Sequence, residues 1–141
     1  MSDPRARLGD MDIPPKDSAA VITALWSRIQ ARDWPGVGEL VAEDAVIDWP
    51  VSAERIVGRA NFVAVNSQYP EGWSIRVLRI VAAGDQAVSE VEVPHAELGL
   101  FRAASFWTVR YGRIVAGTEY WTSPGSDPRP AWRADLTQPL A

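Results

Sequence analysis

Few residues in this chain could move a proton, and Glu119 is the clearest candidate. It lies between Tyr120 and Trp121 in an apolar run, so a fold that buried this run would remove water from its carboxyl group. Desolvation disfavours the charged form and raises the pKa of a carboxyl group towards values useful for proton transfer. Glu119 is therefore a candidate catalytic acid or base. The alternative is a structural glutamate paired with an arginine such as Arg102.

Four other residues could assist such chemistry. Asp48 ends a short apolar run, Glu92 alternates with valines in a later run, and His95 is the only imidazole in the chain. Tyr69, just before a proline, could offer a phenolic donor at a pocket mouth or act as an apolar plug. Each also has a structural alternative. A lone histidine beside a turn, for example, is commonly a surface residue.

Composition narrows the classes of function. The chain has no cysteine and one histidine, which argues against disulfides, thiolate catalysis and metal sites, so we expect no metal and no cofactor. Net charge is −4 with scattered basic residues, so we expect no nucleic-acid partner. No apolar run is long enough to span a bilayer and no secretory signal appears, so we expect no membrane association and a cytoplasmic location. Small-molecule chemistry, small-molecule binding and self-association remain.

The chain is rich in tryptophan. Seven tryptophans are many for one small dry core, because each is large and its N–H needs a partner when buried. Core and dimer-interface positions can hold most of them, and we expect two or three to line a cavity.

The order of hydrophobic patterns predicts helices first and strands afterwards. Ser18 is a suitable N-cap for a helix that ends near Arg32, and a short helical turn follows around residues 37–41. The other predicted elements are a strand over 45–49, a helix over 58–69, and strands over 73–83, 87–93, 100–109 and 114–122. This is the α+β order.

Three segments follow from this reading. Residues 1–17 are expected to form a flexible arm, residues 18–123 a single domain, and residues 124–141 an extended proline-rich tail. The aromatic part of the tail, around Trp132, could fold over a pocket mouth as a lid or clasp a second subunit.

The pattern resembles the nuclear-transport-factor-2-like superfamily, and in particular its SnoaL-like domains. The residues that carry the resemblance are Asp33-Trp34, Glu43-Asp44-Ala45-Val46, Gly58-Arg59, Gly112-Arg113-Ile114 and Glu119-Tyr120-Trp121. The resemblance covers about residues 18–123. It implies a cone-shaped, curved antiparallel sheet wrapped around the N-terminal helices, a cystatin-like α+β roll. Such folds include ketosteroid isomerases, polyketide cyclases, scytalone dehydratases and limonene-epoxide hydrolases.

Strand alternation predicts which side chains of the last hairpin face the pocket. If residues 110–112 form a three-residue loop, Val109 pairs with Arg113 and odd-numbered residues face one another. Ser105 and Trp107 then share a face with Gly117, Glu119 and Trp121, together with Val115. By resemblance to the isomerases that face lines the pocket, and Gly117 would leave room for a ligand.

The preceding hairpin allows two registers. One places Glu90 and Glu92 in the pocket, whereas the other places Ser89, Val91, Val93 and His95 there. Comparison with the isomerase pattern slightly favours the first, and ordinary hydrophobic patterning favours the second.

The sequence departs from the isomerase pattern at two positions. Trp49 stands where the isomerases carry their general base, so Asp48 is only its neighbour and needs a bulge to point inward. Ser105 stands where they carry an acid that polarises a ketone, and a hydroxyl is a weaker donor than such an acid. These departures argue against ketosteroid isomerase activity itself.

The sequence therefore predicts a cofactor-independent enzyme that binds a small hydrophobic molecule and moves a proton with a carboxylate, as isomerases, cyclases, dehydratases and epoxide hydrolases do. The expected catalytic set is Glu119 with Asp48, Glu92 or His95. The expected ligand-binding set is Trp49, Tyr69, Glu90, Ser105, Trp107, Gly117 and Trp121. The alternative is a non-catalytic binding or dimerisation domain of the same fold. In either case a homodimer is expected, because the outer face of the sheet carries apolar side chains.

Overall fold

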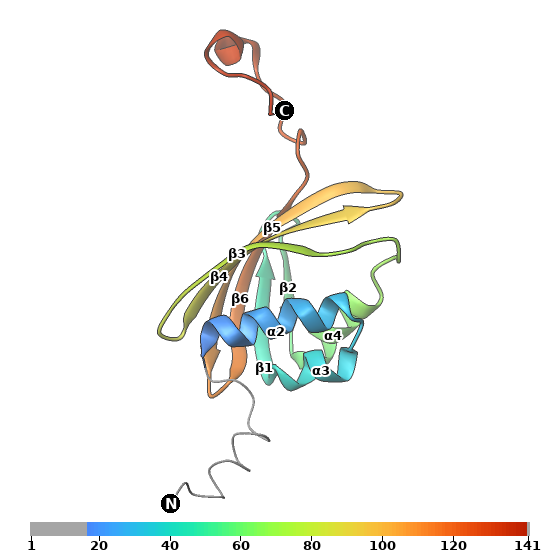
Figure 1. Cartoon of the computed structure of the whole chain (residues 1–141), viewed down its shortest axis with the longest axis vertical. Coiled ribbons are helices and arrows are strands. Elements are labelled where there is room, and N and C mark those ends of the chain that lie inside the picture. The colour runs from blue at the N-terminus through green and yellow to red at the C-terminus, as the bar shows by residue number, and fades with distance from the viewer. Residues whose placement is uncertain (1–16, 141) are drawn as a thin grey trace, which may run out of the picture.

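The computed structural model describes residues 17–140, so all but the last residue of the predicted N-terminal arm lies outside the described part. Three helices and six strands make up the body of the fold (Figure 1). They are α2 (Ser18–Gln30), α3 (Trp34–Glu39), β1 (Val41–Trp49), β2 (Glu54–Val57), α4 (Arg59–Ser67), β3 (Arg76–Ala83), β4 (Gln86–His95), β5 (Gly99–Arg110) and β6 (Arg113–Thr122). The α+β class is confirmed.

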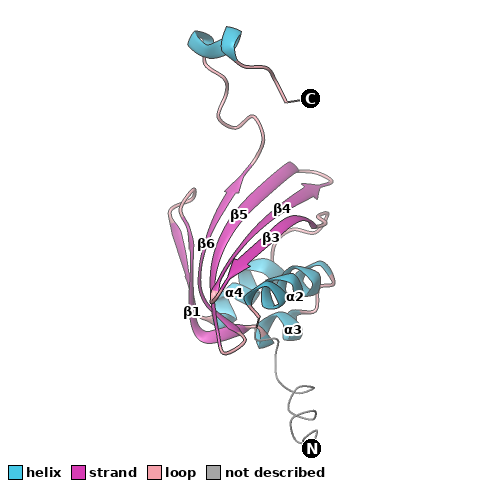
Figure 2. Ribbon diagram, turned by 60° about the vertical axis from the view of Figure 1, so that its left-hand side comes forward, coloured by secondary structure: helices cyan, strands magenta, loops and turns pink. Residues whose placement is uncertain are grey.

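The strands form one curved, unclosed sheet in the order β2-β1-β6-β5-β4-β3. The helices gather on one side of this sheet, as Figure 2 shows. Neighbouring strands are antiparallel except β1 and β6, which are parallel. The sheet is therefore mixed rather than wholly antiparallel, and it gains the short strand β2, which the hydrophobic pattern had not indicated.

Helix α2 packs on the sheet through one apolar stripe. Its buried side chains recur at helical spacing and are Val21, Ile22, Leu25, Trp26 and Ile29. The N-cap is Asp17, whose carboxylate accepts from the Ala19 backbone N–H at 2.9 Å. Ser18, the predicted cap, instead donates its hydroxyl to the Gly84 carbonyl at 2.9 Å and joins the helix to the β3–β4 turn.

The last hairpin differs from the prediction in its turn and in its register, and Val109 does not pair with Arg113. Its turn has two residues, Tyr111 and Gly112, both with positive φ, rather than three. A bulge then leaves Val115 without a partner, because Val109 pairs with Ile114 and the next pair is Thr108 with Ala116. Val115 consequently loses the inward position to Ile114, which is fully buried.

Beyond the bulge, the odd-numbered residues face one another as expected. Ser105 pairs with Glu119, and Trp107 pairs with Gly117. The predicted alternation is therefore confirmed for the part of the hairpin that carries Glu119.

The preceding hairpin adopts the second register. The Ser89 hydroxyl accepts the indole N–H groups of Trp26 and Trp107, each at 3.0 Å, so Ser89 faces the helices. Glu90 and Glu92 lie on the opposite face of β4, where Glu90 forms an ion pair at 2.8 Å with Arg79. The expectation that these glutamates point into the pocket is wrong, because the opposite face of β4, which carries Ser89, packs against Trp26 and Trp107.

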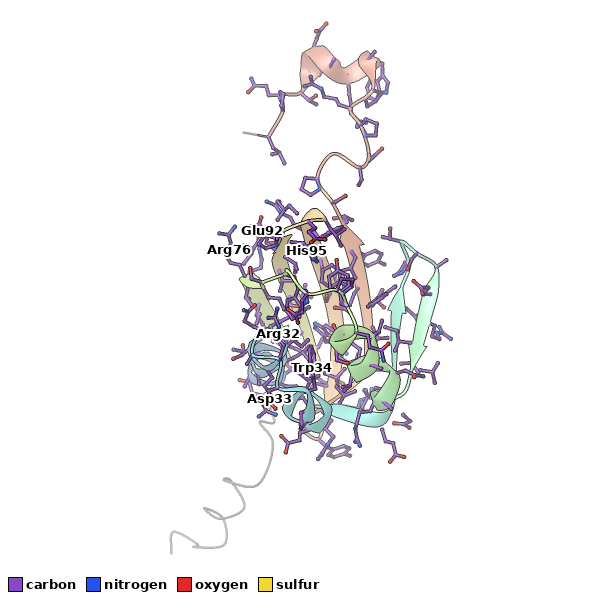
Figure 3. All side chains as sticks on the ribbon, turned by 90° about the vertical axis from the view of Figure 1, so that its right-hand side faces the viewer. Arg32, Asp33, Trp34, Arg76, Glu92 and His95 are labelled. Carbon is purple, nitrogen blue, oxygen red and sulfur yellow. The ribbon has the colours of Figure 1, made fainter. Side chains whose placement is uncertain are left out.

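Glu92 is nevertheless shielded from water by its partners. It forms an ion pair with Arg76, which lies near it in Figure 3, and a second at 2.9 Å with Arg102. These arginines and Glu92 stand directly opposite one another on β3, β4 and β5. Glu92 is thus the centre of an ion-pair group on the outer face and not part of the concave face.

The segment after β6 runs away from the sheet (Figures 1 and 2). It contains a 3-10 helix, η1 (Ala131–Leu136), so the expected wholly extended tail is wrong. Its proposed roles as lid or clasp stay predictions. None of the helices in residues 17–140 is long and apolar enough to cross a membrane.

Gly117 serves packing rather than ligand space. A Cβ built at Gly117 would come within 2.7 Å of the Trp107 ring and 3.4 Å of Ile47. Trp107 is itself fully buried. The indole of Trp107 therefore fills the space that a side chain at residue 117 would need. The predicted role of Gly117 in making room for a ligand is wrong.

This contact predicts a specific sensitivity to added volume. Gly117→Ala should lower the free energy of unfolding by about 1–3 kcal/mol, because the indole of Trp107 has no free space into which to move. Gly38→Ala is the matched control, since a Cβ there meets its nearest atom only at 3.8 Å. Urea unfolding of both variants checks this, and equal stabilities would contradict the packing assigned to Trp107.

Candidate functional site

A cavity of about 360 Å³ lies between the helices and the concave face of the sheet. It is lined by Trp26, Ile29, Trp49, Val51, Ser52, Glu54, Val65, Asn66, Tyr69, Trp73, Ile75, Val93, Phe101, Glu119 and Trp121. Val51 and Tyr69 are also exposed to solvent, which places the mouth between the β1–β2 loop and the end of α4. The size and mostly apolar lining suit a small organic molecule.

Glu119 is the one carboxyl group among the described residues that is both buried and part of this cavity wall. Its side chain is held by two donors: Trp49 Nε1 donates to Oε2 at 2.9 Å and Ser105 Oγ donates to Oε1 at 2.8 Å. β1, β5 and β6 each contribute one member of this group, because Ser105 stands directly opposite Glu119 and β1 lies on the other side of β6.

Burial raises the pKa of Glu119 above the ordinary glutamate value. Hydrogen bonds from Trp49 and Ser105 favour the charged form and hold back part of this rise in pKa. The indole of Trp121 acts on the pKa in the same direction, although its Nε1 has no acceptor at normal hydrogen-bond distance. The pKa of this carboxyl group is therefore higher than that of an exposed glutamate.

Four tryptophans line the cavity: Trp26, Trp49, Trp73 and Trp121. Trp49 and Trp121 were predicted, whereas Trp107 lies beneath the cavity in the core, where its ring meets Trp26 and Phe62 edge to face at 6.4 Å. Trp26 also contacts Trp121 at 6.5 Å. These rings form a stiff aromatic wall around Glu119.

Asp48 lies away from the cavity. It stands directly opposite Arg55 and Thr118, and Arg55 donates to its carboxylate at 2.7 Å. This hydrogen bond holds the pKa of Asp48 below its usual value. No bulge turns Asp48 inward, so the neighbouring Trp49 takes the inward position and Asp48 remains an exposed ion-pair member.

His95 is buried but does not line the cavity. Its Nε2–H donates to the Pro70 carbonyl at 3.1 Å, and its Nδ1 accepts from the backbone N–H groups of Glu97 and Leu98. The imidazole thus ties the segment before β3 to the β4–β5 turn. Both ring nitrogens are occupied, which leaves neither for proton exchange with a ligand.

Of the remaining predicted residues, one lines the cavity, one contacts Glu119 and one lies on the outer face of the sheet. Tyr69 lines the cavity and packs edge to face on His95 at 5.8 Å. Ser105 is fully buried and reaches Glu119 rather than the cavity. Glu90 is on the outer face with Arg79.

Sequence reasoning missed several cavity residues. Trp26 and Ile29 belong to the apolar stripe of α2, and this stripe faces the cavity as well as the core. Trp73 was read as the start of a strand, but it precedes β3 and pairs only with His95 through a bridge. Glu54 could not be found, because β2 itself was not expected.

Comparisons with known proteins identify the family and the fold of this chain. The family model of the SnoaL-like domain matches residues 22–117, which end just before Glu119. No curated protein matches the chain in sequence.

Solved structures resemble the chain over most of its length. One is a proposed ketosteroid isomerase from Kribbella flavida DSM 17836, with 27% identity, a TM-score of 0.79, and coverage of 88% of this chain and 90% of that one. A second is an NTF-2 like protein of unknown function from Burkholderia xenovorans LB400, with 28% identity, a TM-score of 0.70, and coverage of 86% and 93%.

An LEH-like epoxide hydrolase of M. tuberculosis shares the fold at 22% identity, with a TM-score of 0.64 and coverage of 74% of this chain and 82% of that one. The curved sheet, the helices that close its concave side and the matched family model lead to one conclusion: this chain belongs to the SnoaL-like domain family.

Proposed function

We propose that this protein is a cofactor-independent enzyme that transfers a proton to or from a small, largely apolar molecule. The observation that carries the proposal is Glu119, a buried carboxyl group in the wall of an otherwise mainly apolar cavity. Carboxyl groups in such surroundings are poised for general acid or base catalysis, because burial brings their pKa towards the working pH.

The surroundings of Glu119 suit a side chain that acts both as a carboxylate and as the neutral acid. Burial favours the neutral acid, whereas the donors Trp49 and Ser105 stabilise the carboxylate. As a carboxylate, Glu119 removes a proton from a carbon next to an electron-withdrawing group. As the resulting acid, it returns that proton to the ligand, so the group is regenerated in each cycle.

The hydrogen bond from Ser105 to Glu119 limits the reactions that this site could catalyse. Ser105 donates to Glu119 itself, so it is not a second acid for a substrate carbonyl. Together with Trp49 at the position of the isomerase base, this argues for single-carboxyl proton transfer and against ketosteroid isomerisation.

A non-catalytic binding domain is the competing proposal. It is favoured by the small number of acid or base groups: of the predicted set, Asp48, Glu92 and His95 lie outside the cavity lining. The two proposals agree on the ligand class and differ on turnover, so a reaction that needs only a base in an apolar pocket separates them.

Removal of the proton from 5-nitrobenzisoxazole is such a reaction. The base takes the ring proton, the N–O bond breaks, and a coloured phenolate appears. Glu119→Gln should lower the rate by about 100-fold or more, since general base catalysis contributes about that much. Absorbance measurements on purified protein give the rate, and circular dichroism shows that the fold is retained.

Asp48→Asn is the matched control for this experiment, because Asp48 is an exposed carboxylate on the other face of the sheet. It should leave the rate unchanged. A wild-type rate no faster than that of Glu119→Gln would remove Glu119 from catalysis and favour the binding domain.

The raised pKa of Glu119 also predicts how stability depends on pH. The folded state holds this proton more tightly than the unfolded chain, where the pKa is near 4.5. Glu119 therefore contributes stability that is complete below that value and is lost as pH rises through the raised pKa. Urea unfolding over a pH series should show the stability of wild type falling relative to Glu119→Gln. A constant difference would contradict the burial of this carboxyl group.

We also propose that the chain forms a homodimer through the outer face of its sheet. Val81, Val88, Phe106 and Thr118 lie in one row across four strands, and Phe106 contacts the exposed Tyr120 of the next row at 6.1 Å. The charged residues beside them, Arg79 with Glu90 and Arg102 with Glu92, are already paired within the chain. An apolar surface with neutralised neighbours suits self-association.

Phe106→Asp should convert the dimer to a monomer, because it places a charge in the centre of this surface. Tyr111→Asp is the control, since Tyr111 is 94% exposed at a hairpin tip away from the row. Sedimentation equilibrium measures both masses. A monomeric wild type, or a dimeric Phe106→Asp, would overturn the proposal.

A further inference from the structure

One wall of the cavity is an irregular segment rather than a helix or a strand. Residues 69–75 lie between α4 and β3, and Tyr69, Trp73 and Ile75 of this segment line the cavity. Its strand pairing within the described chain is limited to a bridge between Trp73 and His95. Because no full ladder of hydrogen bonds fixes this backbone, its position depends on side chains that reach it from neighbouring elements.

Arg32 holds this wall from the end of α2. Its guanidinium carbon lies 3.4 Å from the centre of the Trp73 ring, and the guanidinium donates to the Trp73 carbonyl at 2.8 Å. The same group donates to both carboxylate oxygens of Glu71, at 2.8 and 3.2 Å. One side chain therefore fixes the ring of Trp73, its backbone and an acidic residue of the same segment.

The contacts of Arg32 reach the cavity only through other residues. Arg32 is not among the residues that line the cavity, whereas Trp73 is. Gln30, on the same turn of α2, accepts from the backbone N–H of Ile75 and makes a second connection between this helix end and the wall. The end of α2 thus acts on a ligand through the position of Trp73 and Ile75.

The backbone of Arg32 adopts a conformation that favours glycine. α2 ends in a Schellman motif, in which the backbone N–H of Arg32 donates to the Ile29 carbonyl and that of Asp33 to the Arg28 carbonyl, each at 2.9 Å. Arg32 has a φ of 58°, in the left-handed region where this motif usually has glycine. Residues with a side chain are strained there, and they cluster at functional sites.

Global stability does not account for an arginine at this position. The Glu71 side chain is 67% exposed, and ion pairs with such exposed partners contribute little to the free energy of unfolding. The strain at the positive φ offsets part of what the contacts contribute. The effect of Arg32 is therefore expected in the order of the cavity wall rather than in the stability of the whole fold.

We infer that Arg32 is a positioning residue of this site, which fixes Trp73 and the segment 69–75 before a ligand arrives. A wall that is already ordered spares the ligand the entropy cost of immobilising it. The inference rests on the ligand-binding part of the proposed function, and it does not require Glu119 to be catalytic.

Arg32→Gly tests this role, because glycine keeps the positive φ while the guanidinium is removed. The probe is 3-methyl-5-nitrobenzisoxazole, which lacks the ring proton and is not consumed. Its affinity should fall about three- to tenfold, since that is the cost of ordering one side chain on binding. Quenching of tryptophan fluorescence gives the dissociation constants.

Two further measurements separate positioning from stability. Urea unfolding should show Arg32→Gly close to wild type, because relief of strain offsets the lost contacts. In proton–nitrogen correlation spectra of the free protein, the indole signal of Trp73 should shift and broaden in Arg32→Gly. The signal of Trp49, whose indole donates to Glu119, should stay in place.

Arg28→Gln is the matched control. Arg28 also lies near the end of α2, donates to the Gly36 carbonyl at 2.7 Å and pairs with Glu39 at 3.3 Å. Its side chain is 32% exposed, against 28% for Arg32, but it joins α2 to α3 rather than to the wall. Arg28→Gln should therefore keep the affinity of wild type.

Two other variants test the guanidinium itself. Arg32→Asn should lose as much affinity as Arg32→Gly, because asparagine tolerates the positive φ without the flexibility of glycine. Glu71→Gln should weaken binding by a smaller factor and should have no further effect in Arg32→Gly, because Glu71 acts through the guanidinium.

Unchanged affinity in Arg32→Gly, or an equal loss in Arg28→Gln, would overturn the inference. So would a large loss of stability in Arg32→Gly, since Arg32 would then be a structural residue. No binding of the probe by wild type would overturn the inference together with the ligand-binding part of the proposed function. A wild type that binds the probe and shows no proton transfer would contradict only the catalytic part.

Discussion

A carboxyl group enclosed by indole rings is the constraint on which this structure depends. Removal of water from Glu119 favours its neutral form, and the donors Trp49 and Ser105 favour its charged form. Neither effect is possible without the curved sheet. β1 ends at Trp49, β5 places Ser105 directly opposite Glu119, and β6 turns that glutamate towards the helices. Both effects act on one side chain, and this balance is the basis of the proton transfer that we propose.

Hydrogen bonds from the tryptophans hold part of the aromatic wall in place. Trp26 and Trp107 share the hydroxyl of Ser89, which fixes the aromatic wall to the sheet. Trp73 and Trp121 belong to the same wall, and their Nε1 atoms have no hydrogen-bond partner within residues 17–140. An apolar cavity with a few fixed polar atoms recognises a ligand by shape first and by orientation second.

Membership of the SnoaL-like family explains the scaffold and leaves the chemistry to individual side chains. Similar structures include a proposed ketosteroid isomerase and a protein of unknown function. In this chain, Asp48 is turned outward to Arg55, and His95 uses both ring nitrogens to join two loops. The site is consequently reduced to one buried carboxyl group, and proton transfer by that single group is the activity that the geometry favours.

Local patterns in the sequence determined much of this protein. Helical spacing located α2 and α4, alternation located the long strands, and the apolar run around Glu119 indicated its burial. The shared face of Ser105 and Glu119 was also predictable, but their direct pairing was not: the predicted register placed Ser105 opposite Gly117, and the two-residue turn with the bulge at Val115 places it opposite Glu119. Only the tertiary structure decided the direction of Glu92 and the inclusion of Trp73 in the cavity. The reason is physical: alternation defines two faces of a strand, but which face is enclosed depends on the helix that packs there, here through Trp26 and Ser89.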